Sequence, residues 1–111
     1  SIAVGVPRDQ IKALKAARES GGGFIAVTDE EILEAISLLA RRVGILAEPA
    51  GATALAGLKK LAETGRCRSD ETAAVMVTGH GLKDIEGVMQ AVDRAPVVIG
   101  NDLEEVKQKV P

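Results

Sequence analysis

The chain has 111 residues, a length typical of one small domain, and a formal net charge of -2. This balance excludes the strongly basic surface that binds nucleic acids or anionic membranes, and Phe24, the single aromatic residue, argues against base-stacking platforms. Cys67 is the only cysteine and cannot form an internal disulfide; with no signal sequence, long apolar run or Cys/His metal cluster, we expect a metal-free cytoplasmic protein.

Helical and extended patterns alternate from the beginning of the chain. Residues 7–9 open a predicted helix that the glycines at 21–23 end, and the apolar residues 24–27 then predict a buried strand. Thr28 with Glu31 three positions later is a capping box, which predicts the start of a second helix.

In the middle of the chain, three residues mark where predicted helices begin or end. Gly44 ends the second predicted helix, and the apolar residues 45–47 form a short strand candidate. Pro49 suits the first turn of a third helix, whose apolar stripe runs to Gly65. The polar residues 66–72 predict a loop.

The last third repeats the alternation and indicates the fold class. Residues 73–77 have no polar position, which is typical of a parallel strand covered on both faces. A helix over residues 85–92, a strand candidate at 97–99 and a short helix capped by Asp102 follow. Strands separated by helices predict an α/β fold, a mainly parallel β-sheet flanked by helices on both faces.

Thr78 follows the apolar run 73–77 directly and precedes Gly79 and Gly81. Ligands of open parallel sheets bind at the carboxyl ends of strands, so the hydroxyl of Thr78 is a candidate ligand contact. The glycines permit a tight turn and a close approach of the backbone to a ligand. Alternatively, Thr78 merely ends the strand, because strand-loop-helix junctions with glycine are common in α/β folds.

Three motifs in the chain are Thr28-Asp29-Glu30-Glu31-Ile32, Glu48-Pro49-Ala50-Gly51-Ala52-Thr53-Ala54-Leu55-Ala56-Gly57-Leu58 and Thr78-Gly79-His80-Gly81-Leu82-Lys83-Asp84. Together they resemble the C-terminal part of threonine synthases. They occur in the family's order, and the resemblance extends over nearly the whole chain. The Glu48 motif is shared more loosely with serine and threonine dehydratases, whereas the Thr78 motif is much more particular to threonine synthases.

The resemblance implies a pyridoxal 5'-phosphate (PLP) enzyme of fold type II, the tryptophan-synthase-β type. Such enzymes convert O-phospho-L-homoserine and water into L-threonine and phosphate. The family's Schiff-base lysine lies in a Ser-x-Lys block and its phosphate loop is rich in glycine; neither block is present here. The resemblance therefore implies that residues 1–111 are the incomplete C-terminal part of the large catalytic domain, inactive alone. Its open strand edges predict a homo-oligomer.

The resemblance also assigns roles to single residues. The hydroxyl of Thr78 contacts the pyridine nitrogen of the cofactor, Gly79 and Gly81 let the backbone pass close to the ring, and Glu48 lies near that ring. From the residues alone, Glu48 is equally well explained as a helix N-cap. His80 has no visible Ser, Cys or metal-ligand partner, so we expect it to shape the loop. Lys83 does not match the Schiff-base lysine.

No residue of this chain is expected to be the reacting base. The arginines flanking Cys67 could lower the pKa of its thiol and make it reactive, but an ordinary surface-loop cysteine is favoured. Two other functions stay open, namely a serine or threonine dehydratase of the same fold type and a stand-alone domain that binds a small ligand or acts in assembly.

Overall fold

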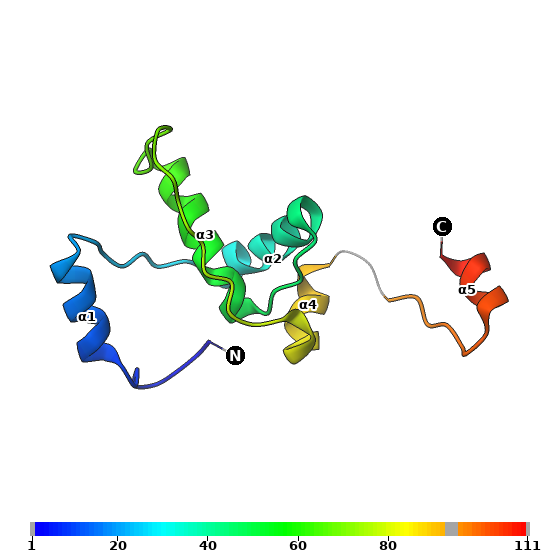
Figure 1. Cartoon of the computed structure of the whole chain (residues 1–111). Helices are drawn as coiled ribbons and strands as arrows, with labels where there is room; N and C mark the ends of the chain where they lie inside the picture. The colour runs from blue at the N-terminus through cyan, green and yellow to red at the C-terminus, as the bar shows by residue number, and fades with distance from the viewer. Residues whose placement is uncertain (1, 93–95, 111) are drawn as a thin grey trace.

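The structure, a computed structural model, describes residues 2–92 and 96–110 and is helical (Figure 1). The helices are α1 (Gln10–Glu19), α2 (Asp29–Val43), α3 (Pro49–Glu63), the 3-10 helix η1 (Gly81–Lys83), α4 (Ile85–Ala91) and α5 (Leu103–Lys109). Ser1 and Pro111, the ends of the expected 1–111 domain, lie outside the described residues. Within the described ranges, no helix is long and apolar enough to cross a membrane.

The predicted parallel β-sheet flanked by helices is wrong for the described part of the chain. Residues 24–27, 73–77 and 97–99 run as extended chain, but none of them pairs into a strand. Among residues 2–92 and 96–110, the β-type contact is one isolated antiparallel bridge between Ala47 and His80. A strand needs a neighbour for its N–H and C=O groups, and an apolar run indicates local extension without supplying that neighbour.

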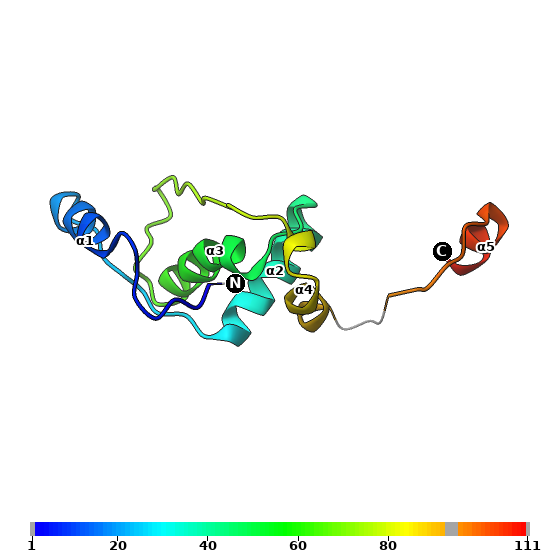
Figure 2. The same ribbon diagram turned by 90° about the horizontal axis from the view of Figure 1, so that it is seen from below.

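The helices do not close into a compact globule. The radius of gyration is 17.6 Å, whereas a compact domain of this length has about 13 Å. Figures 1 and 2 show α1 and α5 at opposite ends of the molecule, away from the central group of α2, α3 and α4. Neither α1 nor α5 contains a buried residue. Much of the apolar surface of this chain is therefore uncovered.

The core lies where α2 packs against α3. Ile36 of α2, only 1% exposed, is its largest fully buried side chain. Opposite it α3 presents small residues, which allow the two helices to approach closely. The buried apolar residues are Ile32, Ala35, Ile36, Leu39, Ala47, Ala52 and Ala56.

The predicted helix boundaries are confirmed at α2. Thr28 Oγ1 accepts a hydrogen bond from the Glu31 N–H at 3.2 Å, and Glu31 Oε2 accepts one from the Thr28 N–H at 2.7 Å. At the other end, Gly44 adopts a left-handed conformation with φ 70°, which a residue with a side chain adopts only at a cost. Local signals therefore determine both ends of this helix.

We expect Thr28→Ala to lower the free energy of unfolding by about 1 kcal/mol, because it leaves a first-turn N–H of α2 without its acceptor. Urea titration followed by circular dichroism at 222 nm measures this. The matched control is Thr72→Ala, which shortens an exposed threonine in the loop before residues 73–77. Equal midpoints for Thr28→Ala and Thr72→Ala would contradict the capping role.

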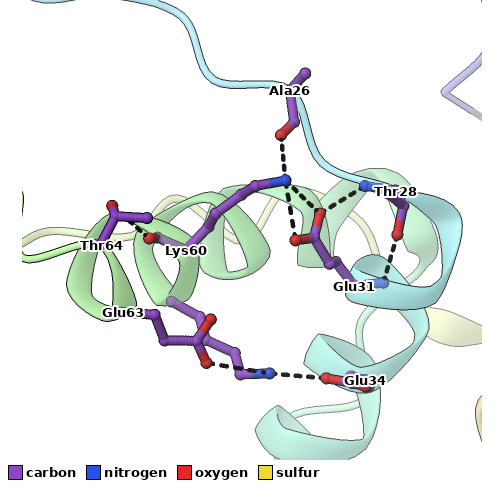
Figure 3. A network of polar contacts seen from close by, with 8 residues as sticks. Ala26, Thr28, Glu31, Glu34, Lys60, Glu63 and Thr64 are labelled. Atoms are coloured by element: carbon purple, nitrogen blue, oxygen red, sulfur yellow. Dashed lines mark hydrogen bonds and ion pairs between the residues drawn. The ribbon is translucent and has the colours of Figure 1, made fainter.

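Lys60 ties the extended segment 24–28 to the helical core (Figure 3). Its Nζ donates to the backbone oxygen of Ala26 at 2.9 Å and to Glu31 Oε2 at 3.0 Å. A second pair beside it joins Lys59 of α3 to Glu34 of α2 at 2.7 Å. Both lysines therefore bridge α3 to the α2 side of the core.

The same network makes stability depend on pH. Hydrogen bonds from the Thr28 N–H and from Lys60 lower the pKa of Glu31 below its ordinary 4.5. A carboxyl whose pKa is depressed on folding contributes stability above its unfolded pKa and loses it as the pH falls through the folded value. We therefore expect the unfolding free energy to decrease as the pH is lowered below about 4.5.

Glu31→Gln should weaken this acid dependence, and denaturant titrations from pH 7 to pH 3 measure it. Glu86→Gln is the control, since it removes an exposed carboxylate of α4. If both variants keep the acid dependence of the original chain, the Glu31 network is not its source.

Candidate functional site

The structure brings the Glu48 motif and the Thr78 motif side by side. The Glu48 N–H donates to the backbone oxygen of Gly79 at 3.0 Å, and the Gly81 N–H donates to that of Leu46 at 2.9 Å. These two bonds flank the antiparallel bridge between Ala47 and His80. The segment before α3 is thus fixed against the segment that leads into η1.

The side chain of Glu48 lies directly over Gly79. Gly79 is buried, and a Cβ atom added to it would collide with the carboxyl group of Glu48. Glu48 is half-buried and makes no side-chain hydrogen bond or ion pair with the described residues. It occupies the N-cap position of α3, but its side chain does not cap the helix. Its carboxylate is therefore available to a ligand.

Thr78 stands at the edge of this contact. Its side chain is exposed, and its hydroxyl has no hydrogen bond within the described part of the chain. Thr78 and Gly79 follow the extended residues 73–77, as expected from the sequence, although no strand ends there. The Thr78 hydroxyl and the Glu48 carboxylate thus both lack a partner among the described residues, and both residues adjoin Gly79, Thr78 along the chain and Glu48 through its side chain.

Gly51, in the first turn of α3, completes the arrangement and was not singled out from the sequence. A Cβ atom on Gly51 would lie 2.9 Å from the oxygen and 3.0 Å from the nitrogen of Gly79, and 3.4 Å from the nitrogen of Thr78. The first turn of α3 is therefore the support of the Thr78-Gly79 backbone. A glycine in the first turn of an alanine-rich helix is the sequence signal that could have indicated this contact.

His80 and Gly81 shape the backbone after the site. His80 Nδ1 accepts a hydrogen bond from the Leu82 N–H at 3.1 Å, which agrees with the expected loop-shaping role. The space that a side chain on Gly81 would need is filled by Leu46 and by Val88 of α4. Lys83 is exposed in η1. The glycine at 81 is thus explained by packing.

The remaining sequence candidates lie away from this arrangement. Arg68, next to the partly buried Cys67, donates to both carboxylate oxygens of Asp70, at 2.9 and 2.6 Å. This pair raises the pKa of Arg68 and lowers that of Asp70, so the Arg68 charge is directed at Asp70. The described residues contain no group of three metal-ligating side chains.

A hollow of about 550 Å³ between α2, α3 and α4 is separate from Glu48 and Thr78. Its lining mixes both charges, including Glu34, Arg41 and Lys59. Since Thr78 is exposed, a ligand that contacts its hydroxyl is covered by this chain from one side only.

A neutral hydroxyl and a carboxylate next to the same glycine suit an uncharged or cationic polar ligand better than an anion, because the carboxylate repels negative charge. The hydroxyl can hydrogen-bond a ring nitrogen without imposing a charge on it, and the carboxylate accepts from a donor or attracts a cation. The absence of a side chain on Gly79 leaves the room that the Glu48 carboxyl group occupies against the backbone.

Comparison with known proteins finds one family, described as "Pyridoxal-phosphate dependent enzyme", that matches residues 1–79. The chain is 47% identical over 108 residues to a protein of Methanocaldococcus jannaschii named threonine synthase, covering 97% of this chain and 26% of that protein. It is 41% identical over 115 residues to the threonine synthase of Halalkalibacterium halodurans, covering 100% of this chain and 32% of that protein. The protein of that name from Methanosarcina acetivorans is 43% identical over 110 residues, covering 99% and 27%. The chain thus spans about a quarter to a third of the length of these relatives.

Proposed function

The chain belongs to the family of pyridoxal-phosphate dependent enzymes, and from this premise we propose that residues 1–111 are the C-terminal part of the catalytic domain of a threonine synthase. The reaction converts O-phospho-L-homoserine and water into L-threonine and phosphate. The names of the relatives support the choice of reaction. The observation that carries the proposal is the contact between the Glu48 motif and the Thr78 motif, because the motif most particular to threonine synthases forms one local structure with the motif that the wider fold type shares.

The described residues fit the pyridine edge of the cofactor. Thr78 offers an unpaired neutral hydroxyl for the ring nitrogen, and Gly79, which has no side chain, lets the Glu48 carboxyl group lie against the backbone next to Thr78. Glu48 offers a carboxylate directly over Gly79. When bound, the cofactor supplies an electron sink for proton removal from the amino acid substrate. A hydroxyl partner, unlike a carboxylate, does not hold a proton on the ring nitrogen. Thr78 would therefore reduce the electron-withdrawing strength of the ring.

This chain binds and orients the cofactor and does not supply the reacting base. Glu48 and Thr78 sit on backbone that is fixed by the hydrogen bonds of Gly79 and Gly81. Lys83 lies in η1 with its side chain exposed, which does not suit a covalent attachment point. We propose that the covalent lysine and the phosphate-binding loop belong to another part of the enzyme, so that this chain alone is inactive.

We further propose that the enzyme is cytoplasmic and that this chain self-associates. Extended segments 24–27 and 73–77 pair with no strand among the described residues, and Phe24 and Met76 on them are 69% and 76% exposed. Unpaired extended segments with exposed apolar side chains promote association between copies. Light scattering at high concentration is the test, and a clean monomer would contradict it.

The function is tested by measuring phosphate release from O-phosphohomoserine in the presence of PLP. We expect no release by this chain alone, and release together with threonine by the full-length polypeptide of which it forms part. The full-length protein without PLP is the control. Formation of 2-oxobutyrate from threonine, with no phosphate release, would overturn the proposal in favour of a dehydratase.

A further inference from the structure

The orientation of the His80 imidazole carries a further inference. Its Nδ1 accepts the Leu82 N–H at 3.1 Å, so this nitrogen carries no proton, and in the neutral ring the proton is on Nε2. The described residues give the ring no other hydrogen bond, and the side chain is exposed. The ring is thus held by one interaction, and that interaction is with its own backbone.

This interaction closes the turn that follows the site. His80 is the N-cap of η1, and its side chain accepts the first free N–H of that helix in the manner of a capping residue. The Lys83 N–H donates to the His80 oxygen at 3.0 Å, so the residue binds η1 through both its backbone and its side chain.

The same residue is fixed on its other side. His80 forms the bridge with Ala47, and its neighbours Gly79 and Gly81 make the two hydrogen bonds that flank the bridge. The turn after His80 therefore determines the direction in which the chain leaves the bridge. A change in this turn would displace the Gly81 N–H, whose hydrogen bond to Leu46 is one of the two that hold the segment of Gly79 against that of Glu48.

We propose that His80 is a positioning residue of the Glu48-Thr78 site: by accepting the Leu82 N–H it fixes the turn that keeps Gly79 beneath Glu48 and Thr78 at the edge of the bound ring. This inference rests on the proposed function where it concerns the cofactor. A residue whose Nδ1 is engaged in this way shapes the site and is not available through that nitrogen to remove a proton from substrate.

The structural part is tested on this chain with His80→Ala and His80→Asn. Asparagine offers a side-chain oxygen that accepts an N–H two residues further on, so it keeps the interaction while it removes the imidazole. We expect amide exchange at Leu82 to accelerate about tenfold in His80→Ala, the effect of losing one hydrogen bond, and to stay close to the original rate in His80→Asn. Equal exchange in all three proteins, or acceleration in both variants, would overturn the proposal.

The functional part is tested on the full-length protein with PLP. We expect His80→Ala to shift the absorption maximum of bound PLP and to weaken its binding, and His80→Asn to restore both. Loss of both in the asparagine variant would show that the imidazole itself is required and would overturn the positioning role. If the unsubstituted full-length protein binds no PLP, the proposed function fails, while the exchange measurement still decides whether His80 fixes the turn.

Discussion

Ile36→Ala is expected to lower the free energy of unfolding by about 2–5 kcal/mol, the usual cost of removing a large aliphatic side chain from a packed interior. Ile36 is 1% exposed and lies at the centre of the contact between α2 and α3. The buried members that α3 contributes to this cluster, Ala52 and Ala56, have no longer side chain that could move into the space left behind.

Thermal and urea unfolding followed by circular dichroism measure the loss. Ile11→Ala in α1 is the matched control, since Ile11 is 78% exposed and its truncation should change stability by less than about 0.5 kcal/mol. Native domains as a class have only about 5–15 kcal/mol of stability, so Ile36→Ala should come close to abolishing the cooperative transition. Similar midpoints for the two variants would mean that α2 and α3 do not form the core in solution.

Gly51→Ala is expected to destabilise the protein by about 1–3 kcal/mol and to weaken cofactor binding by the full-length enzyme. The added methyl group would meet the backbone of Gly79 at 2.9 and 3.0 Å, and backbone has no rotamer that relieves the contact. The first turn of α3 must move away from the Thr78-Gly79 segment. That movement separates Glu48 from Gly79, so stability and binding should fall together.

Gly57→Ala provides the control within the same helix. Its added methyl group would meet only the Cγ2 atom of Ile25, at 3.1 Å, which belongs to a flexible side chain. Replacing a glycine inside a helix by alanine gains about 0.5–1 kcal/mol of helix propensity, so Gly57→Ala should be neutral or slightly stabilising. Urea titration and PLP titration compare the two. If the Gly51→Ala and Gly57→Ala variants have the same free energy of unfolding, α3 does not approach the Thr78-Gly79 segment closely.

The helices were predictable because their ends depend on residues a few positions apart. The capping box of Thr28 and Glu31, the left-handed Gly44 and the first-turn Pro49 act within one turn of chain, and each is confirmed at the position that the sequence indicates. The sequence of residues 81–83 carries no comparable signal, because η1 depends on the orientation of the His80 ring.

The sheet was not predictable in the same way. The apolar runs at 24–27 and 73–77 do indicate extended chain, but pairing depends on a second segment that local pattern cannot specify. Among the described residues, these two extended segments pack against helices instead of pairing with another strand. Ile25 and residues 73–75 line the same hollow, of about 370 Å³, along α3.

For the site, Glu48, Thr78 and Gly79 were predicted from the sequence and its resemblance, and the structure brings the three together. Their roles toward a cofactor stay a proposal. The atoms that hold these three residues in place could not be predicted from the sequence. The contact of Gly51 with Gly79 depends on the angle at which α3 leaves the bridge, a tertiary property that no spacing of residues encodes.

The bridge between Ala47 and His80 closes a loop that contains the whole of α3. Bringing the ends of such a loop together costs conformational entropy. Contacts at the junction of the two ends and within the loop offset this cost. Those contacts are the hydrogen bonds of Glu48 and Gly81, which are also the framework of the site. Formation of the site and closure of the loop are consequently one event, and the amides of Glu48 and Gly81 should exchange with a single shared opening free energy. A ligand that contacts both Glu48 and Thr78 binds only the closed loop. The opening of the loop therefore slows in proportion to the fraction of sites that the ligand occupies.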